Sequence, residues 1–117
     1  MSVQEFYERI NGDYKSIAAL FKTDERILTL LKMIFEDENF DLLRKSMASQ
    51  DYETAFRAAH TMKGFCLNLC LTQLQKSVSD LTEALRGTVK PNAAELYKIV
   101  EDDYANLLKN LNELVHE

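Results

Sequence analysis

Residues that interrupt helices are scarce in this chain. Only three glycines and one proline occur among its 117 residues, and no stretch alternates strictly between apolar and polar side chains as a half-buried strand does. Apolar residues recur instead at intervals of three and four, the spacing that places them on one face of a helix. The sequence therefore predicts an all-α fold.

Three helices are predicted in the first half of the chain. The first spans about residues 3–10, and Asp13 caps a second short helix after a break. A third starts near Asp24, and the acidic run at residues 36–39 interrupts or kinks it. Its buried side chains are expected to be Ile27, Leu30, Leu31 and Ile34 before the interruption, and Leu42, Leu43 and Met47 after it.

A fourth helix is predicted over about residues 52–70, ending around Leu69 to Leu71, with Ser49 or Asp51 as its N-cap. Two more helices follow it. The signals at their ends are a capping box formed by Thr72 and Gln75, a stop at Gly87, and a proline in the first turn of the last helix, Pro91.

The expected architecture follows from these elements. Four substantial amphipathic helices joined by short connections predict an antiparallel four-helix bundle. The length allows one compact domain and is too short for two ordinary ones. We expect a single domain over residues 1–117, in which a bundle of about residues 24–117 has the helical turns of about residues 1–22 packed across one end.

Charge and composition exclude several classes of function. Fourteen basic and nineteen acidic residues give a net charge of −5, which argues against binding to nucleic acid or an anionic membrane. The apolar runs are short, and the N-terminus lacks the basic and apolar regions of a secretion signal. Cys66 and Cys70, four apart in one predicted helix, are expected to share a face as small buried hydrophobes. We expect a cytoplasmic protein.

The strongest functional signal is Ala-His-Thr-Met-Lys-Gly at residues 59–64. At about 100° per residue, Lys63 and Gly64 lie within roughly 60° of His60 on one helix face. Imidazole can accept a group covalently, and lysine can offset negative charge on that group. A glycine inside a helix costs about 0.5–1 kcal/mol relative to alanine, so Gly64 requires a reason such as a partner's close approach. The pattern suits an exposed histidine that carries phosphate.

The opposite face of this helix has the composition of a core. Its apolar residues cluster roughly opposite His60, so the imidazole is expected to point toward solvent. These residues are Ala55, Ala58, Ala59, Met62, Phe65, Cys66 and Leu69.

The histidine segment resembles the histidine-containing phosphotransfer (HPt) domains of bacterial and plant phosphorelays. The family pattern is Ala-His-x-Leu-Lys-Gly followed by Asn-Leu-Gly and a spaced leucine. Gln50-Asp51-Tyr52 also resembles the family's Gly-Asp-aromatic lead-in. Two residues depart from the pattern: Cys70 stands where glycine is usual, and Leu67 where many members have a small residue. The downstream matches are Asn68, Leu69, Leu71 and Leu74.

The resemblance implies a role for each matching residue. His60 would accept a phosphoryl group from a receiver-domain aspartate and pass it to another receiver. Lys63 would stabilise the phosphoryl group, and Gly64 would leave the opening for the receiver. The other expected docking residues are Arg57, Phe56 and Leu67.

The same resemblance implies the partners, which are response-regulator receiver domains and an upstream sensor kinase. The receiver supplies the magnesium ion and the acidic pocket, so no cofactor is expected in this chain, and a monomer is expected. The sequence has no Gly-rich phosphate loop, Walker lysine motif or paired aspartates for a nucleotide-metal site. We expect a phosphohistidine carrier without ATP-dependent kinase activity.

Other interpretations of these residues stay open. His60, Cys66 and Cys70 are suitable ligand types for zinc, although the cysteines face away from the histidine and a fourth ligand is not evident. His60 could be an inert surface residue, and the chain a helical interaction module that binds receivers or other signalling proteins without carrying phosphate. His116 is assigned no function.

Overall fold

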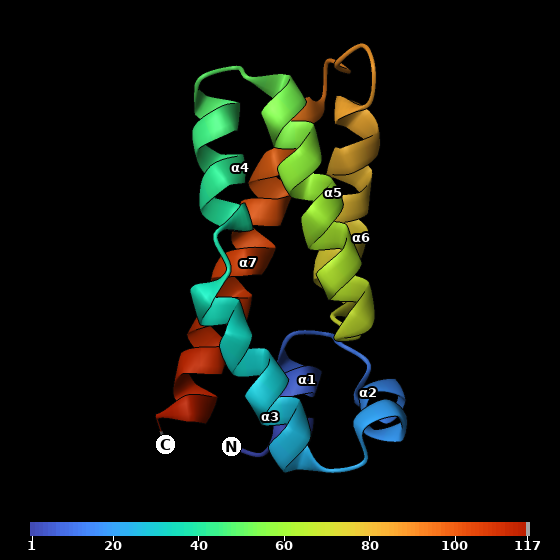
Figure 1. The fold of residues 1–117 in the computed structure, drawn as a ribbon, viewed down its shortest axis with the longest axis vertical. Helices are drawn as coiled ribbons and strands as arrows, with labels where there is room; N and C mark the ends of the chain where they lie inside the picture. The colour runs from blue at the N-terminus through green and yellow to red at the C-terminus, as the bar shows by residue number, and fades with distance from the viewer. Residues whose placement is uncertain (117) are drawn as a thin grey trace.

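The computed structural model describes residues 1–116, and their regular structure is entirely helical. The all-α prediction is confirmed. The helices, drawn in Figure 1, are α1 (Val3–Arg9), α2 (Tyr14–Phe21), α3 (Asp24–Lys32), the 3-10 helix η1 (Met33–Glu36), α4 (Asn39–Ala48), α5 (Tyr52–Asn68), α6 (Thr72–Leu85) and α7 (Ala93–Val115).

The long helices pack side by side in an elongated body of 42 × 25 × 19 Å. Helix α5 packs between α4 and α6, and α6 packs in turn on α7. Figure 1 shows α7 running along most of the molecule, with α1, α2 and α3 gathered at the end near both termini. Within residues 1–116, no helix combines the length and the apolar composition needed to cross a bilayer.

One buried apolar cluster connects α1 to α7. Ile27, Leu31 and Ile34 are buried in it as predicted, whereas Leu30 is only partly buried. The prediction for Leu42 is wrong, because this side chain is 44% exposed. Helix α4 restarts at Asn39 in a register that buries Leu43, as predicted, and leaves Leu42 on the exposed side.

The acidic run separates two helical segments, as predicted. Asp37 has an extended backbone and ends η1. Its carboxylate accepts hydrogen bonds from the backbone N–H of Asn39 at 2.8 Å and from the Asn39 side chain at 3.2 Å. At the break, Asp37 therefore provides an acceptor for the first backbone N–H of α4.

Two predicted N-caps are confirmed. The Asp13 carboxylate accepts the backbone N–H of Ser16 at the start of α2. At the start of α5, the structure selects Asp51 from the two candidates, and its carboxylate accepts the N–H of Thr54 at 3.3 Å. The histidine helix is thus fixed at its N-terminus by a local side chain.

Two other predicted helix starts are wrong. The N-cap of α6 is Leu71 rather than Thr72, and it makes no side-chain cap hydrogen bond. Leu71 is buried, so core packing sets the start of α6 one residue before the expected capping box. Pro91 lies in a turn before α7, which begins at Ala93. The stop at Gly87 is confirmed, since α6 ends two residues earlier and Gly87 has φ of 65°.

The turn between α5 and α6 is held by the N-terminal segment. The Tyr7 hydroxyl donates to the carbonyl of Leu69 at 2.7 Å, and the backbone N–H of Asp13 donates to the carbonyl of Cys70 at 3.0 Å. Gly12 fits closely here, because a Cβ at this position would lie 2.6 Å from the Tyr7 ring. Helices α1 and α2 are thereby joined to the end of the histidine helix.

Candidate functional site

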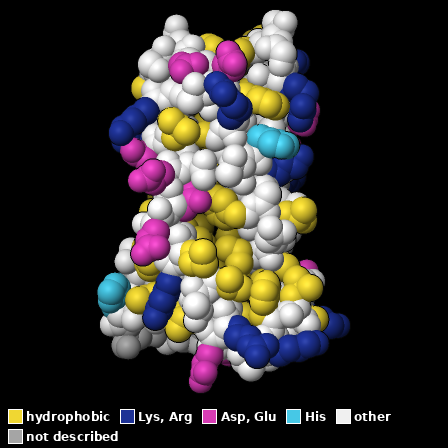
Figure 2. Space-filling view, viewed as in Figure 1, with side chains coloured by type: hydrophobic (Ala, Val, Ile, Leu, Met, Phe, Trp, Pro, Cys, Tyr) yellow, Lys and Arg dark blue, Asp and Glu magenta, His cyan; other side chains and the backbone are white. Residues whose placement is uncertain are grey.

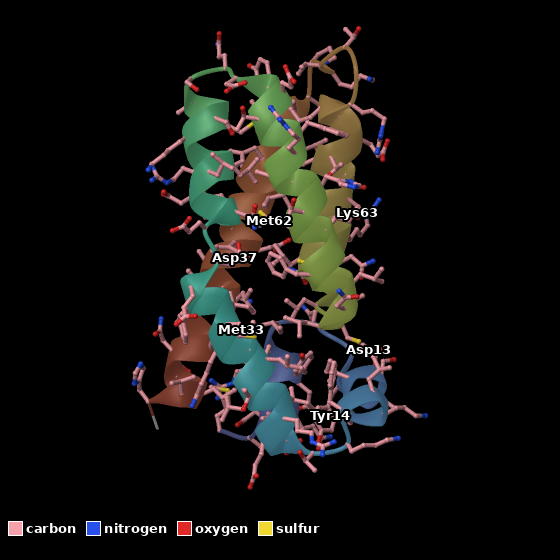
Figure 3. All side chains as sticks on the ribbon, in the orientation of Figure 1. Asp13, Tyr14, Met33, Asp37, Met62 and Lys63 are labelled. Atoms are coloured by element: carbon pink, nitrogen blue, oxygen red, sulfur yellow. The ribbon has the colours of Figure 1, made fainter. Side chains whose placement is uncertain are left out.

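Helix α5 is anchored on one face and open on the other. The predicted core residues of this helix are buried, except for Phe65, which is partly buried. His60 is exposed on the opposite side. Figure 3 shows Met62 turned into the bundle and Lys63 turned toward α6. The packing thus presents the imidazole to solvent on a rigid helix.

An aromatic side chain lies against the imidazole. The ring of Phe56, one turn earlier on α5, is nearly parallel to that of His60, at 13° and with centroids 6.0 Å apart. The guanidinium carbon of Arg86, the residue that follows α6, lies 5.0 Å from the centroid of the Phe56 ring. Such contacts restrict the orientations available to the imidazole while leaving it accessible.

Lys63 lies three residues after His60, and Arg57 lies three residues before it. Lys63 is partly buried, and no carboxylate oxygen of residues 1–116 lies within ion-pair distance of it. The pKa of Glu83 on α6 is lowered by a hydrogen bond from Arg86, by the charge of Arg86 and, to a smaller extent, by the charge of Lys63. Lys63 therefore faces α6 without a tight partner, and its ammonium group is free to contact an added anion.

Gly64 follows one turn after His60 and has open space above it. A Cβ at this position would meet no atom of the chain within 4 Å. No neighbour inside the protein therefore requires a glycine in the middle of α5. Leu67, on the same face, is 60% exposed. The helix face from His60 to Leu67 is accessible, partly apolar and free of bulky side chains at its centre.

A groove of about 320 Å³ lies between the C-terminal part of α5 and the end of α3. Its apolar wall includes Phe65, and Met33 on the other side is 61% exposed. Figure 2 shows apolar side chains gathered at the narrowed middle of the molecule, and Figure 3 labels Met33 there. This groove was not predicted from the sequence, because Met33 lies outside the core stripe and gave no periodic signal.

The residues that α6 contributes were also missed. Glu83 and Arg86 are three apart and form an ion pair through two contacts, Nε–Oε2 at 3.0 Å and Nη2–Oε1 at 3.2 Å. In the sequence this spacing indicates only an exposed helix pair. The packing of α6 on α5 brings Arg86 over the ring of Phe56, which in turn stacks on His60.

The candidate zinc ligands do not come together. Cys66 is buried, and its burial raises the pKa of the thiol to about 12. Cys70 was expected to share a helix face with Cys66, but it lies beyond the last residue of α5, Asn68, with φ of 56°. Among residues 1–116, no three His, Cys, Asp or Glu side chains are grouped so that they could hold a metal ion.

The turn after α5 has a left-handed backbone at Cys70, the position where the family pattern has glycine. Glycine is the residue that adopts such a φ most readily. Here a cysteine adopts it, while its carbonyl accepts the hydrogen bond from Asp13. The turn therefore has a backbone conformation suited to glycine, although the residue is a cysteine.

Fold and site together define a helical domain that presents one histidine with adjacent cations. A family model described as the Hpt domain matches residues 29–116. The chain belongs to the Hpt domain family, which supports a role in histidine phosphotransfer and phosphorelays in general. The comparisons with curated proteins and with solved structures gave no match.

Proposed function

We propose that this chain is a histidine phosphotransfer protein that shuttles a phosphoryl group between receiver domains. The observation that carries the proposal is the exposed imidazole of His60 on a helix whose other face is buried, with Lys63 and the open space at Gly64 one turn away. Family membership supports the same role.

The reaction requires little covalent machinery from this chain. The ring nitrogen of His60 that bears no hydrogen forms a bond to phosphorus while the bond between phosphorus and the receiver's aspartate oxygen breaks. The aspartate leaves as a carboxylate, and the reverse reaction loads a second receiver. Lys63 offsets charge on the moving phosphoryl group, whereas the partner supplies the acidic pocket and magnesium.

The receiver docks over the α5 face that contains His60, with Gly64 at its centre. Exposed Leu67 gives this face apolar area, and exposed Arg57 gives it charge. Phe56 contributes less directly, since Arg86 covers part of its ring. These docking roles stay predictions.

The remaining expectations concern assembly and location. We propose that residues 1–117 act as one unit in which four long helical segments form an antiparallel bundle. The packing of α5 between α4 and α6, and of α6 on α7, supports this. Action as a monomer and location in the cytoplasm stay predictions, which sedimentation and cell fractionation would test.

The central experiment mixes the chain with a receiver domain labelled on its aspartate. We expect acid-labile, base-stable label on the wild type and none on His60→Gln. His116→Gln is the matched control, because it removes the other histidine at the far end of α7, and it should be labelled normally. Label on His60→Gln would refute the site. Receiver binding without any label on the wild type would favour the interaction module instead.

A further inference from the structure

Glu83, on α6, is a carboxylate that pairs with a cation near the candidate site. Glu83 holds Arg86 through two hydrogen bonds, and Arg86 lies over the ring of Phe56. Phe56 in turn stacks on His60. Glu83 is therefore connected to the imidazole through only two intervening side chains, although it comes from a different helix.

Glu83 faces more than one positive charge. Its pKa is lowered first by the hydrogen bond from Arg86, and also by the charges of Arg86, Lys63 and Lys90. The ion pair with Arg86 is solvent-exposed on both sides, with side-chain exposures of 58% and 53%. Such a pair is held weakly enough that another anion can compete for its cation.

A phosphoryl group on His60 would be that competing anion. It brings about two negative charges to the α5 face that also carries Lys63, while Arg86 lies over the neighbouring ring of Phe56. Phosphate oxygens match the planar donors of a guanidinium as well as a carboxylate does. The ring of Phe56, which stacks on His60, still offers Arg86 a contact when the contact with Glu83 is lost.

We propose, on the basis of the phosphotransfer role inferred above, that Glu83 is the counter-anion of this site. In the unmodified chain it holds Arg86 and faces Lys63. When His60 is phosphorylated, the phosphoryl group takes over these cations, and the repulsion from the remaining carboxylate limits how tightly the phosphoryl group is held. Glu83 thereby keeps the group transferable in both directions. It acts as a positioning residue through Arg86 and Lys63 and is not a catalytic residue.

The first test measures a transfer equilibrium. The chain is first treated with phosphoramidate, whose phosphorus–nitrogen bond breaks as the bond to the His60 ring nitrogen forms and ammonia leaves. It is then mixed with a receiver domain that exchanges phosphate with the wild type, and the ratio of phosphorylated chain to phosphorylated receiver is measured at the plateau. Glu83→Gln should raise this ratio about two- to fivefold, the range expected for one exposed charge.

Glu113→Gln is the matched control, because Glu113 also forms an exposed ion pair with an arginine, Arg9, but at the opposite end of the bundle. This variant should leave the ratio unchanged. The increase in Glu83→Gln should shrink at high salt, since exposed charges are screened. An equal ratio in wild type and Glu83→Gln would overturn the proposal, as would an equal rise in Glu113→Gln.

The failure of this inference is distinguishable from failure of the phosphotransfer role. If phosphoramidate and labelled receivers both leave His60 unmodified in the wild type, the proposed function fails. If His60 is modified normally and only the effect of Glu83 is missing, the inference alone fails.

A second measurement requires no variant. The carbon-13 resonance of the Glu83 carboxylate is recorded at neutral pH, where phosphohistidine survives, before and after modification of His60 with phosphoramidate. Loss of the hydrogen bonds from Arg86 should shift this resonance. An unchanged resonance would mean that Glu83 still holds Arg86, and that result would overturn the proposal.

Discussion

The hydroxyl of Tyr7 donates a hydrogen bond to the backbone carbonyl of Leu69, which ends the histidine helix, at 2.7 Å. The phenol is buried, and its burial raises the pKa of Tyr7 far above the usual range. The hydrogen bond therefore persists at every ordinary pH. It makes the position of α1 part of the structure that supports the end of α5.

Tyr7→Phe should lower the free energy of unfolding by about 1–3 kcal/mol, because the buried carbonyl loses its donor. Urea titration followed by circular dichroism measures this. Tyr14→Phe is the control, since its hydroxyl donates to Asp24 in an exposed hydrogen bond, and it should change stability much less. Equal effects of the two substitutions would contradict the structural role of Tyr7.

Gly64→Ala should stabilise the fold by about 0.5–1 kcal/mol, because alanine favours helix and the added methyl group meets no atom of the chain. Transfer from a receiver should nevertheless become slower, because the methyl group occupies the open space beside His60. Thermal unfolding and the rate of label transfer test the two effects. Gly12→Ala offers a contrast, since its Cβ would clash with Tyr7 and should destabilise the chain.

Lys63→Ala should slow the labelling of His60 about fivefold, as expected when one partly buried cation near a developing negative charge is removed. Its melting temperature should stay close to that of the wild type, because Lys63 makes no ion pair within the described residues. Lys63→Arg should recover most of the rate. A large loss of stability in Lys63→Ala would instead show a structural role.

The two cysteines should react at different rates. Burial raises the pKa of Cys66 to about 12, while the thiol of Cys70 is only partly covered, although burial and the nearby Asp13 raise its pKa as well. In the native chain, iodoacetamide should therefore modify Cys70 first, and Cys66 only after unfolding. Peptide mass spectrometry at successive times checks the order. Early modification of Cys66 would contradict its burial.

Asp51 should make the stability of the histidine helix sensitive to acid. Hydrogen bonds from the hydroxyl and the backbone N–H of Thr54 lower the pKa of Asp51 below its usual value of 3.8. The stabilisation is therefore complete above about pH 4 and is lost as the pH falls through the lowered pKa of the folded state.

The matched comparison for this effect is Asp51→Asn, which keeps a capping side chain but removes the charge. The difference in unfolding free energy between wild type and Asp51→Asn should be constant near neutral pH and shrink below about pH 4. A difference that is independent of pH would show that the carboxylate charge of Asp51 contributes nothing.

The sequence predicted correctly the structural features that neighbouring residues determine. Asp13 and Asp51 cap the helices that follow them, and the acidic run around Asp37 breaks the chain where expected. His60 and Lys63 share a face because they belong to one helix, whose period is fixed. Local chemistry and periodicity suffice for such features.

The wrong and the missing predictions concern features that depend on packing between helices. Burial of Leu71 displaced the expected cap at Thr72, and the restart of α4 left Leu42 exposed. Glu83 and Arg86 lie next to the site only because α6 packs on α5. Helical periodicity shows which face of α6 is buried, but not which residues it places opposite Phe56.

The match to the Hpt domain family begins at residue 29, inside α3. A fragment trimmed to that boundary would keep His60 and its cations but lose Tyr7 and Asp13, the two donors that support the strained turn after α5. Cys70 would then have to maintain its left-handed backbone unaided. The shortest fragment that folds stably by itself should therefore begin well before residue 29, where the family match starts.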